Sequence, residues 1–185
     1  MTARAHELPD RAAAALSLEE IYDRHFDFVW RSLRSLGVAE SAIDDAVQEL
    51  FVVVHRRLAD FEGRSSLKSW LFGIARNIAL RELRTRQRKV RDADLAAEPA
   101  APGADPCDIA ERAEAAELLV RLLHRLDDDK RAIFVLVEIE QMTVPDAAAA
   151  LAINVNTAYS RLRLARRRFQ EAAARFCRTE GAADD

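Results

Sequence analysis

The sequence is poor in the residues that mark several protein classes. Its 185 residues include two cysteines, five glycines and five prolines, and 6% of them are aromatic. Cys107 and Cys177 cannot build a disulfide framework, and neither has a second cysteine or a histidine at metal-ligand spacing, so we interpret both as incidental. The low glycine and proline content argues against a turn-rich β architecture. The abundance of Ala, Leu, Arg and Glu predicts an all-α protein.

Long apolar segments are also missing. The longest uninterrupted apolar run covers residues 147–153, whereas a membrane-spanning helix needs about 20 apolar residues. The first sixteen residues contain Glu7 and Asp10, where a signal peptide would need a basic start followed by an apolar stretch. The sequence therefore predicts a cytoplasmic protein with no membrane insertion.

Residue sets that carry catalysis or bind metals are absent as well. The sequence contains no phosphate-binding loop, no carboxylate cluster with metal-ligand spacing and no combination typical of nucleophilic catalysis. Its four histidines, His6, His25, His55 and His124, lie on separate segments. We expect no enzymatic activity, no cofactor and no bound metal.

The net charge of −3 hides a strong division along the chain. Residues 64–91 contain nine Lys or Arg and one acid, a local charge of +8, and residues 152–178 reach +6. Between them, residues 92–117 carry −7. Two positive surfaces joined by an acidic connector indicate two nucleic-acid contacts and a linker that nucleic acid repels. Charge alone leaves open that both basic stretches are only solvated helix faces.

A domain boundary falls in the acidic connector. Residues 92–103 lack an apolar period and contain two prolines and a glycine, a composition typical of a flexible linker. With 50% hydrophobic residues, a chain of this length can bury two modest cores. We therefore divide it into an N-terminal tail (1–16), a first domain (17–91), a linker (92–104), a second domain (105–178) and an acidic tail (179–185).

Helical periodicity predicts a docking face in the first domain. A first helix begins at the capping box formed by Ser17 and Glu20 and ends at Gly37, and its apolar residues predict a scaffold: Leu18, Ile21, Tyr22, Phe26, Val29, Leu33 and Leu36. A second helix starts near Ser41, with core positions at Ile43, Val47, Leu50, Phe51, Val54 and Leu58. Its opposite arc gathers Asp45, Gln48, Glu49, Val52 and Arg56. Polar groups around an exposed valine can dock a helical partner, although an ordinary solvated face has the same composition.

A third helix runs from about Leu67 into the first basic stretch. Its core arc contains Leu67, Leu71, Ile74 and Ile78. Another arc, about 60° wide, aligns Trp70, Asn77, Arg81, Arg84 and Arg88. The indole can stack on an unpaired base, the amide can bond a base edge, and the arginines can neutralise phosphates, which together would grip a separated strand. The alternative is that Trp70 belongs to the core and the arginines only solubilise the helix.

The second domain contains the pattern of a helix-turn-helix. Asp105 and Pro106 open one helix, and a largely buried helix follows over residues 129–138. Thr143 caps a short, alanine-rich helix, which a turn at Ala152 and Ile153 joins to a last helix over residues 155–168.

The last of these helices would read DNA. Asn154 caps it, and its exposed residues that can reach base edges or phosphates are Asn156, Thr157, Tyr159, Ser160, Arg161 and Arg163. Arg166, Arg167 and Arg168 extend the surface along the backbone. A plain helical hairpin is the alternative interpretation.

Three motifs in this order resemble the extracytoplasmic-function (ECF) branch of the sigma-70 family of bacterial RNA polymerase sigma factors. Residues 45–51 (DAVQELF) are similar to the family's helix that binds core polymerase. Residues 61–77, most clearly residues 69–77 (SWLFGIARN), are similar to the segment that reads the minus-ten element and melts the promoter. Residues 154–166 (NVNTAYSRLRLAR) are similar to the recognition helix for the minus-thirty-five element. The resemblance covers residues 18–176.

The resemblance implies a protein that binds core RNA polymerase and directs promoter recognition and DNA melting, for a stress- or signal-responsive gene set. It assigns polymerase binding to Asp45, Gln48, Glu49, Val52 and Arg56, and minus-ten DNA to Trp70, Arg76, Asn77, Arg81, Arg84 and Arg88. It assigns the minus-thirty-five element to Asn156, Thr157, Tyr159, Ser160, Arg161, Arg163 and Arg167. It also implies an anti-sigma factor as a partner and a free chain that is monomeric.

Three positions depart from the family pattern, and one of them is Ala158, which replaces a usual valine. Ala152 stands where the family usually has Gly, which costs about 1 kcal/mol if the backbone there is left-handed. Tyr159 replaces a usual lysine and removes one phosphate contact.

Two rival functions are a dimeric helix-turn-helix repressor or activator, which would not need the stripe beginning at Trp70, and a helical adaptor that binds only protein.

Overall fold

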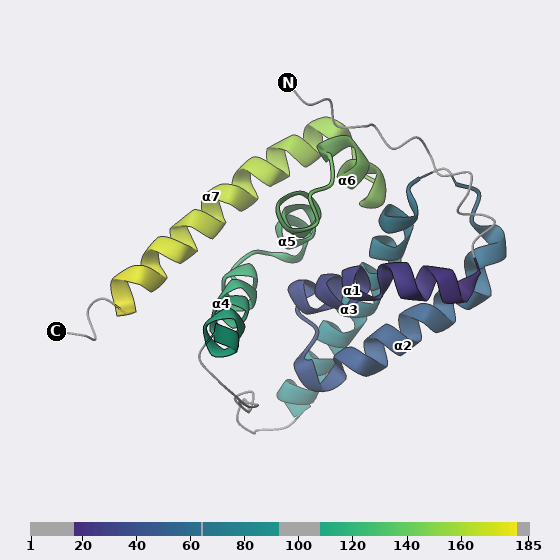
Figure 1. Ribbon diagram of the computed structural model, residues 1–185. Helices are drawn as coiled ribbons and strands as arrows, with labels where there is room; N and C mark the ends of the chain where they lie inside the picture. The colour runs from purple at the N-terminus through teal and green to yellow at the C-terminus, as the bar shows by residue number, and fades with distance from the viewer. Residues whose placement is uncertain (1–16, 64, 93–107, 181–185) are drawn as a thin grey trace.

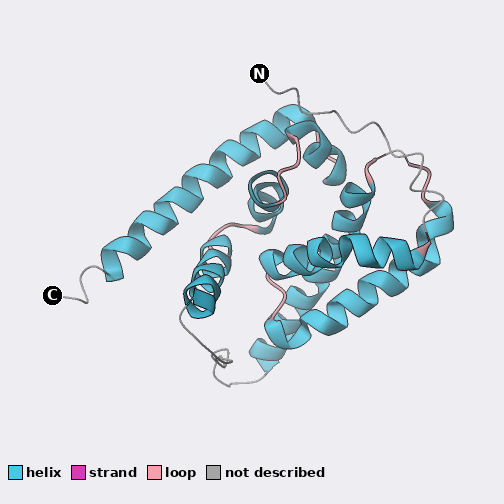
Figure 2. Ribbon diagram, in the orientation of Figure 1, coloured by secondary structure: helices cyan, strands magenta, loops and turns pink. Residues whose placement is uncertain are grey.

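The computed structural model describes residues 17–63, 65–92 and 108–180, and in these ranges all regular structure is helical (Figure 2). The first domain contains α1 (Leu18–Leu36), α2 (Glu40–Arg57), the 3-10 turn η2 (Leu58–Asp60) and α3 (Leu67–Asp92). The second contains α4 (Asp108–Leu123), α5 (Asp128–Phe134), the π-helical turn η3 (Val135–Ile139), α6 (Val144–Ala150) and α7 (Val155–Glu180). The expected all-α class is confirmed, and none of the described helices is long and apolar enough to cross a membrane.

Helix α1 begins and ends at the residues that the sequence predicts. The Ser17 hydroxyl accepts the Glu20 backbone N–H, and the Glu20 carboxylate accepts the Ser17 N–H, which satisfies two amides at the helix start. Gly37 ends the helix at φ +102°, a left-handed conformation that favours glycine. The chain can therefore reverse within a few residues and place α2 against α1.

The core of the first domain follows the predicted arcs. In α2, Ile43, Val47, Leu50, Phe51 and Val54 are buried. In α3, the buried residues include Leu67, Leu71, Ile74 and Ile78. The prediction for the first helix is wrong at one residue, because Tyr22 is 44% exposed and lies at the edge of the core.

The helix-turn-helix of the second domain is formed by α6 and α7. The Thr143 hydroxyl accepts the Asp146 N–H and begins α6. Ala152 lies in the turn at φ +53°, the left-handed conformation expected where the family has glycine. The Asn154 side chain then accepts the Asn156 N–H at the start of α7.

Helix boundaries in the second domain differ from the prediction in three places. The recognition helix continues to Glu180, well past the predicted end at Arg168, because apolar residues such as Phe169 keep packing against the domain; its ring stacks on Phe134 with centroids 4.7 Å apart. The helix predicted over residues 129–138 begins at Asp128, capped by Asp127, and turns π-helical from Val135. The predicted start at residues 105–106 and the linker lie outside the described residues.

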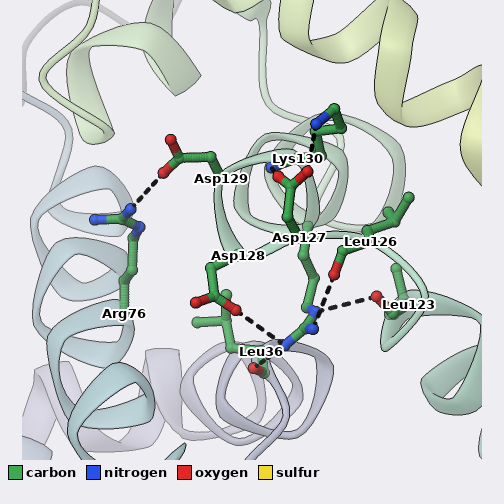
Figure 3. A network of polar contacts seen from close by, with 9 residues as sticks. Leu36, Arg76, Leu123, Leu126, Asp127, Asp128, Asp129 and Lys130 are labelled. Carbon is green, nitrogen blue, oxygen red and sulfur yellow. Dashed lines mark hydrogen bonds and ion pairs between the residues drawn. The ribbon is translucent and has the colours of Figure 1, made fainter. Parts of the chain in front are cut away.

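The two domains pack against each other. Figure 1 shows α4, α5 and α6 lying between α7 and the bundle of α1 to α3. Arg131 of α5 is only 7% exposed and donates to the carbonyl oxygens of Leu36, Leu123 and Leu126 (Figure 3). Leu36 and Leu123 end α1 and α4, so one guanidinium satisfies carbonyls at the ends of helices from both domains.

Candidate nucleic-acid and protein-docking surfaces

The predicted docking face forms a continuous surface on α2. Asp45, Gln48 and Arg56 are exposed, and Val52 is 42% exposed. Glu49 is partly covered because its carboxylate pairs with α3. All five side chains fall within an arc of about 100° on the helix. The face therefore combines an unburied aliphatic side chain with charged groups of both signs.

An apolar groove that the sequence analysis missed borders this face. It has a volume of about 530 Å³ and lies between α1 and α2. Its walls include Tyr22, Phe26, Val47, Phe51 and Val52. The Tyr22 ring lies 4.6 Å from the Phe51 ring, centroid to centroid. Helical periodicity places both Tyr22 and Phe51 in the core. Only the packing of α1 against α2 shows that Tyr22 lies at the edge of the core, beside the groove.

One ion pair joins the docking face to the predicted DNA stripe. Both carboxylate oxygens of Glu49 on α2 accept hydrogen bonds from the guanidinium of Arg81 on α3. This hydrogen bonding lowers the pKa of Glu49 and raises the pKa of Arg81. The two residues, assigned from sequence to different partners, therefore form one bidentate pair that orients α3 on α2.

The stripe on α3 is only partly free. Asn77, Arg84 and Arg88 are exposed. Trp70 is half-buried, and its ring packs on Phe61 at 5.0 Å between centroids, so one part of the indole belongs to the core and another faces out. Trp70 therefore belongs partly to the core, and base stacking by its accessible part stays a prediction.

Arg76 does not share this stripe. It lies about 120° around α3 from Trp70 and faces the second domain. Its Nη2 donates to Asp129 Oδ1 of α5 at 2.8 Å, as the dashed line in Figure 3 shows. Its Nε is buried without a hydrogen-bond partner among the described residues.

The recognition helix presents most of its predicted residues to solvent. Asn156, Ser160, Arg163 and Arg167 are exposed and lie within about 60° of one another. Thr157 is exposed on a neighbouring face, and Tyr159 is 55% exposed. Among the flanking arginines, Arg166 pairs with Glu138 at 2.7 Å and is not free.

Arg161 differs from the other predicted DNA contacts on this helix. It lies about 140° from Asn156 around α7. Its Nη2 is 3.2 Å from Asp129 Oδ2 of α5, in the same domain, so it turns toward α5 rather than toward the exposed face. Asp129 therefore meets arginines from both predicted DNA surfaces.

Comparison with known families identifies the kind of protein that carries these surfaces. Residues 21–89 match the family Sigma-70 region 2, and residues 116–169 match Sigma-70, region 4. Together these matches cover more than half of the chain. The protein belongs to the sigma-70 family. This sigma factor carries its docking face and stripe within the region 2 match, and its helix-turn-helix within the region 4 match.

Individual relatives place the sigma factor in the ECF branch. It is 34% identical over 157 residues to RNA polymerase sigma factor NccH of Alcaligenes xylosoxydans xylosoxydans, covering 80% of this chain and 81% of the relative. It is 30% identical to the ECF RNA polymerase sigma-E factor of Escherichia coli K12, covering 73% of this chain and 75% of that protein. A solved complex of the sigma factor RpoE with the anti-sigma factor NepR from Bartonella quintana superposes with a TM-score of 0.60 and 29% identity, over 83% of this chain and 96% of RpoE.

Membership establishes the function at the level of the family. The protein is an ECF sigma factor, a non-enzymatic subunit that directs RNA polymerase to promoters in transcription initiation. The family resemblance and the all-helical, two-domain fold expected from the sequence are thereby confirmed. The roles of individual side chains remain predictions.

Proposed function

We propose that the docking face on α2 binds core polymerase through Asp45, Gln48, Glu49, Val52 and Arg56. The supporting observation is an exposed valine beside an open apolar groove, ringed by charges of both signs. A helical partner can bury the valine and the groove while pairing its own charges with Asp45 and Arg56. Glu49 takes part through the bidentate pair that fixes α3 next to this face.

The α3 surface reads and opens the minus-ten region. The outward part of Trp70 stacks on an unpaired base, Asn77 bonds a base edge, and Arg81, Arg84 and Arg88 bind phosphates. Arg76 joins this set only when it leaves Asp129. Base stacking contributes on the order of 1–3 kcal/mol, enough to shift a marginal melting equilibrium tenfold or more.

A template that is already open tests the role of Trp70 in melting. We expect Trp70→Ala to lose transcription from duplex promoters and to recover it on a template mismatched around the start site. Phe61→Leu, which removes the ring that supports the indole, is the companion variant and should show a weaker form of the same defect. Failure of the mismatched template to rescue Trp70→Ala would remove this role.

The exposed face of α7 reads the minus-thirty-five element. Asn156, Ser160 and Arg163 lie on one face near the start of the helix, where a recognition helix enters the major groove, and Thr157 and Tyr159 flank them. Arg167 lies about one turn beyond Arg163 and contacts phosphate. Arg161 joins the interface once it is released from Asp129.

One observation carries this proposal. Each of the two domains has an exposed basic helical face, and the first domain also has the apolar groove between α1 and α2. We further infer that the protein acts in the cytoplasm on a stress- or signal-responsive gene set and that the free chain is monomeric. An anti-sigma factor is the expected protein antagonist, which the likeness to RpoE bound by the anti-sigma factor NepR supports. Copurification with core polymerase, followed by promoter-specific transcription from the reconstituted complex, tests the proposal against a repressor and against an adaptor.

A further inference from the structure

The recognition helix begins with two apolar side chains that nothing covers. Among the described residues, the exposed large hydrophobic side chains are Tyr22 and Val52 in the first domain and Val155 and Tyr159 on α7. Tyr22 and Val52 line the groove between α1 and α2. Val155 is 38% exposed and Tyr159 is 55% exposed. They are four residues apart, so their side chains are neighbours on one edge of the exposed face of α7.

The surroundings of this apolar pair are strongly basic. Residues 147–170 contain five arginines and no Asp or Glu. Arg163 follows Tyr159 by four residues and is exposed next to it. A polyanion complements such a surface. We therefore take DNA, rather than another protein, as the molecule that covers Val155 and Tyr159.

The pair lies on the part of a recognition helix that enters the major groove. Helix α7 starts at Val155, and the side chain of Asn154 caps it by accepting the Asn156 N–H. The N-terminal residues of a recognition helix contact base edges. Val155 and Tyr159 occupy the first and second turns of α7. Their apolar atoms would therefore meet base edges rather than phosphates.

One base presents an apolar group in the major groove. Thymine carries its 5-methyl group there, whereas adenine, guanine and cytosine are distinguished by hydrogen-bond donors and acceptors. A polar neighbour of the pair is suited to the base opposite thymine. The Ser160 hydroxyl donates its hydrogen to the Asn156 carbonyl oxygen at 2.9 Å, so toward a base it can only accept a hydrogen bond. Adenine, the partner of thymine, presents an amino donor in the same groove.

We propose that Val155 and Tyr159 select thymine in the minus-thirty-five element by packing against its 5-methyl group. The inference rests on the proposed role of α7 in reading that element. It adds the base that is selected, the group on that base that is read, and Val155 as a residue that reads it. The aromatic ring of Tyr159 contributes a contact that depends on sequence, which a contact with phosphate does not.

Deoxyuridine in place of thymine tests the proposal at a single methyl group, because the two bases pair alike and differ only in that group. The polymerase reconstituted with the unmodified sigma factor first selects an upstream element from a randomised promoter library. Each thymine of that element, on either strand, is then replaced by deoxyuridine in turn. We expect the polymerase to bind about fourfold more weakly at one thymine or at two adjacent ones, which is the effect of one buried methyl group. Replacements between the two promoter elements are the control and should have no effect.

Variants of the pair connect the methyl group to these two side chains. We expect Val155→Ala and Tyr159→Ala each to reduce the ratio of the affinities for thymine and deoxyuridine at that position, and the double variant to bring the ratio to about one. Tyr159→Phe keeps the ring and should keep a ratio of about four. Gln170→Ala, at an exposed residue further along α7, is the matched control and should also keep it. Each ratio compares one protein preparation on two templates, so a loss of folded protein cancels.

The proposal is overturned if the selected element has no fixed A·T pair, or if deoxyuridine weakens binding at none of its thymines. An unchanged ratio in the double variant overturns it too, and if that variant also binds core polymerase more weakly, a protein covers the pair instead. Loss of the ratio in Tyr159→Phe would assign the contact to the hydroxyl group and not to the ring.

Arg163→Ala separates this failure from a failure of the proposed function. If Arg163→Ala changes the preferred upstream sequence while deoxyuridine has no effect, only the methyl contact is wrong. If neither Arg163→Ala nor any variant of the pair changes that preference, the proposed reading of DNA by α7 is wrong.

Discussion

The Nη1 of Arg131 on α5 donates to the carbonyl oxygen of Leu36 on α1 at 2.9 Å, across the boundary between the two domains. The same guanidinium donates to Leu123 and Leu126 within its own domain, each at 3.0 Å. Asp128 lies 3.7 Å away and partly balances the charge. Arg131 therefore supports the second domain itself as well as its packing against the first.

Removal of this guanidinium should destabilise the chain more than removal of a surface arginine. Arg131→Ala leaves three carbonyl oxygens without their donor, and we expect a loss of about 2–4 kcal/mol in the free energy of unfolding. Arg131→Lys should recover only part of it, because one ammonium cannot reach all three carbonyls. Urea unfolding measures the change, with exposed Arg125→Ala as the control, expected within about 0.5 kcal/mol of the unmodified chain. Equal effects of Arg131→Ala and Arg125→Ala would contradict this role.

The left-handed turn of the helix-turn-helix offers a stabilising substitution. Ala152 adopts φ +53°, where the alanine Cβ is strained and glycine is not. We expect Ala152→Gly to raise the free energy of unfolding by about 1 kcal/mol. Ala149→Gly, at an exposed helical position in α6, is the matched control and should lower it by about 0.5–1 kcal/mol. The same sign for both substitutions would show that the turn is not strained.

Acid should weaken the fold through His124. Partial desolvation of its imidazole, then the charges of Arg131 and Arg86, lower the pKa of His124 below its ordinary value. The unfolded chain takes up this proton at a higher pH than the folded chain, so the free energy of unfolding falls as the pH drops below about 6.5.

Urea unfolding at about pH 7.5 and about pH 5.5 checks this dependence on pH. His124→Gln should lose less stability between the two conditions than the unmodified chain does. His55→Gln, on the surface of α2, should behave like the unmodified chain. An identical acid sensitivity in His124→Gln and the unmodified chain would rule His124 out as the source.

The docking face should be separable from the stability of the fold. Gln48→Ala combined with Val52→Ala removes two exposed side chains of α2 and leaves the pair between Glu49 and Arg81 intact. We expect core polymerase to bind this variant at least about tenfold more weakly, with little change in unfolding. A matched pair on α1, Arg24→Ala with Asp27→Ala, should bind normally in the same fluorescence anisotropy titration. Normal binding by the α2 variant would move polymerase docking elsewhere.

Sequence patterns predicted the local structure well because its causes are local. The Ser17 capping box and the buried arcs of α2 and α3 follow from neighbouring residues or from helical period. The left-handed conformation of Ala152 was a possibility that only the family's usual glycine at that position suggested. The end of α7 was wrong because contacts with distant residues, such as the stacking of Phe169 on Phe134, prolong the helix.

Relations between distant residues could not be predicted in the same way. Nothing near Arg131 in sequence indicates three carbonyl partners, one of them in the other domain. Arg76 and Arg161 look like free DNA contacts in sequence, but the packing of α3 on the second domain brings Arg76 to Asp129, and the packing of α7 on α5 brings Arg161 to the same carboxylate. Tyr22 has the spacing of a core residue and becomes a groove wall because α2 covers only one side of it.

The central claim is that this ECF sigma factor selects promoters through separate base-reading and phosphate-binding residues on two domains. The most direct test is transcription by the reconstituted polymerase from a promoter library randomised over the upstream element, at two salt concentrations. We expect Arg163→Ala to change the ranking of upstream sequences, because each base contact discriminates between sequences by about 1–3 kcal/mol. We expect Arg167→Ala to lower transcription from all promoters by the same factor and to reduce the slope of its salt dependence by roughly one unit. Identical rankings for the unmodified chain and both variants would contradict base reading by α7, and no specific transcripts from any of the three would contradict the claim itself.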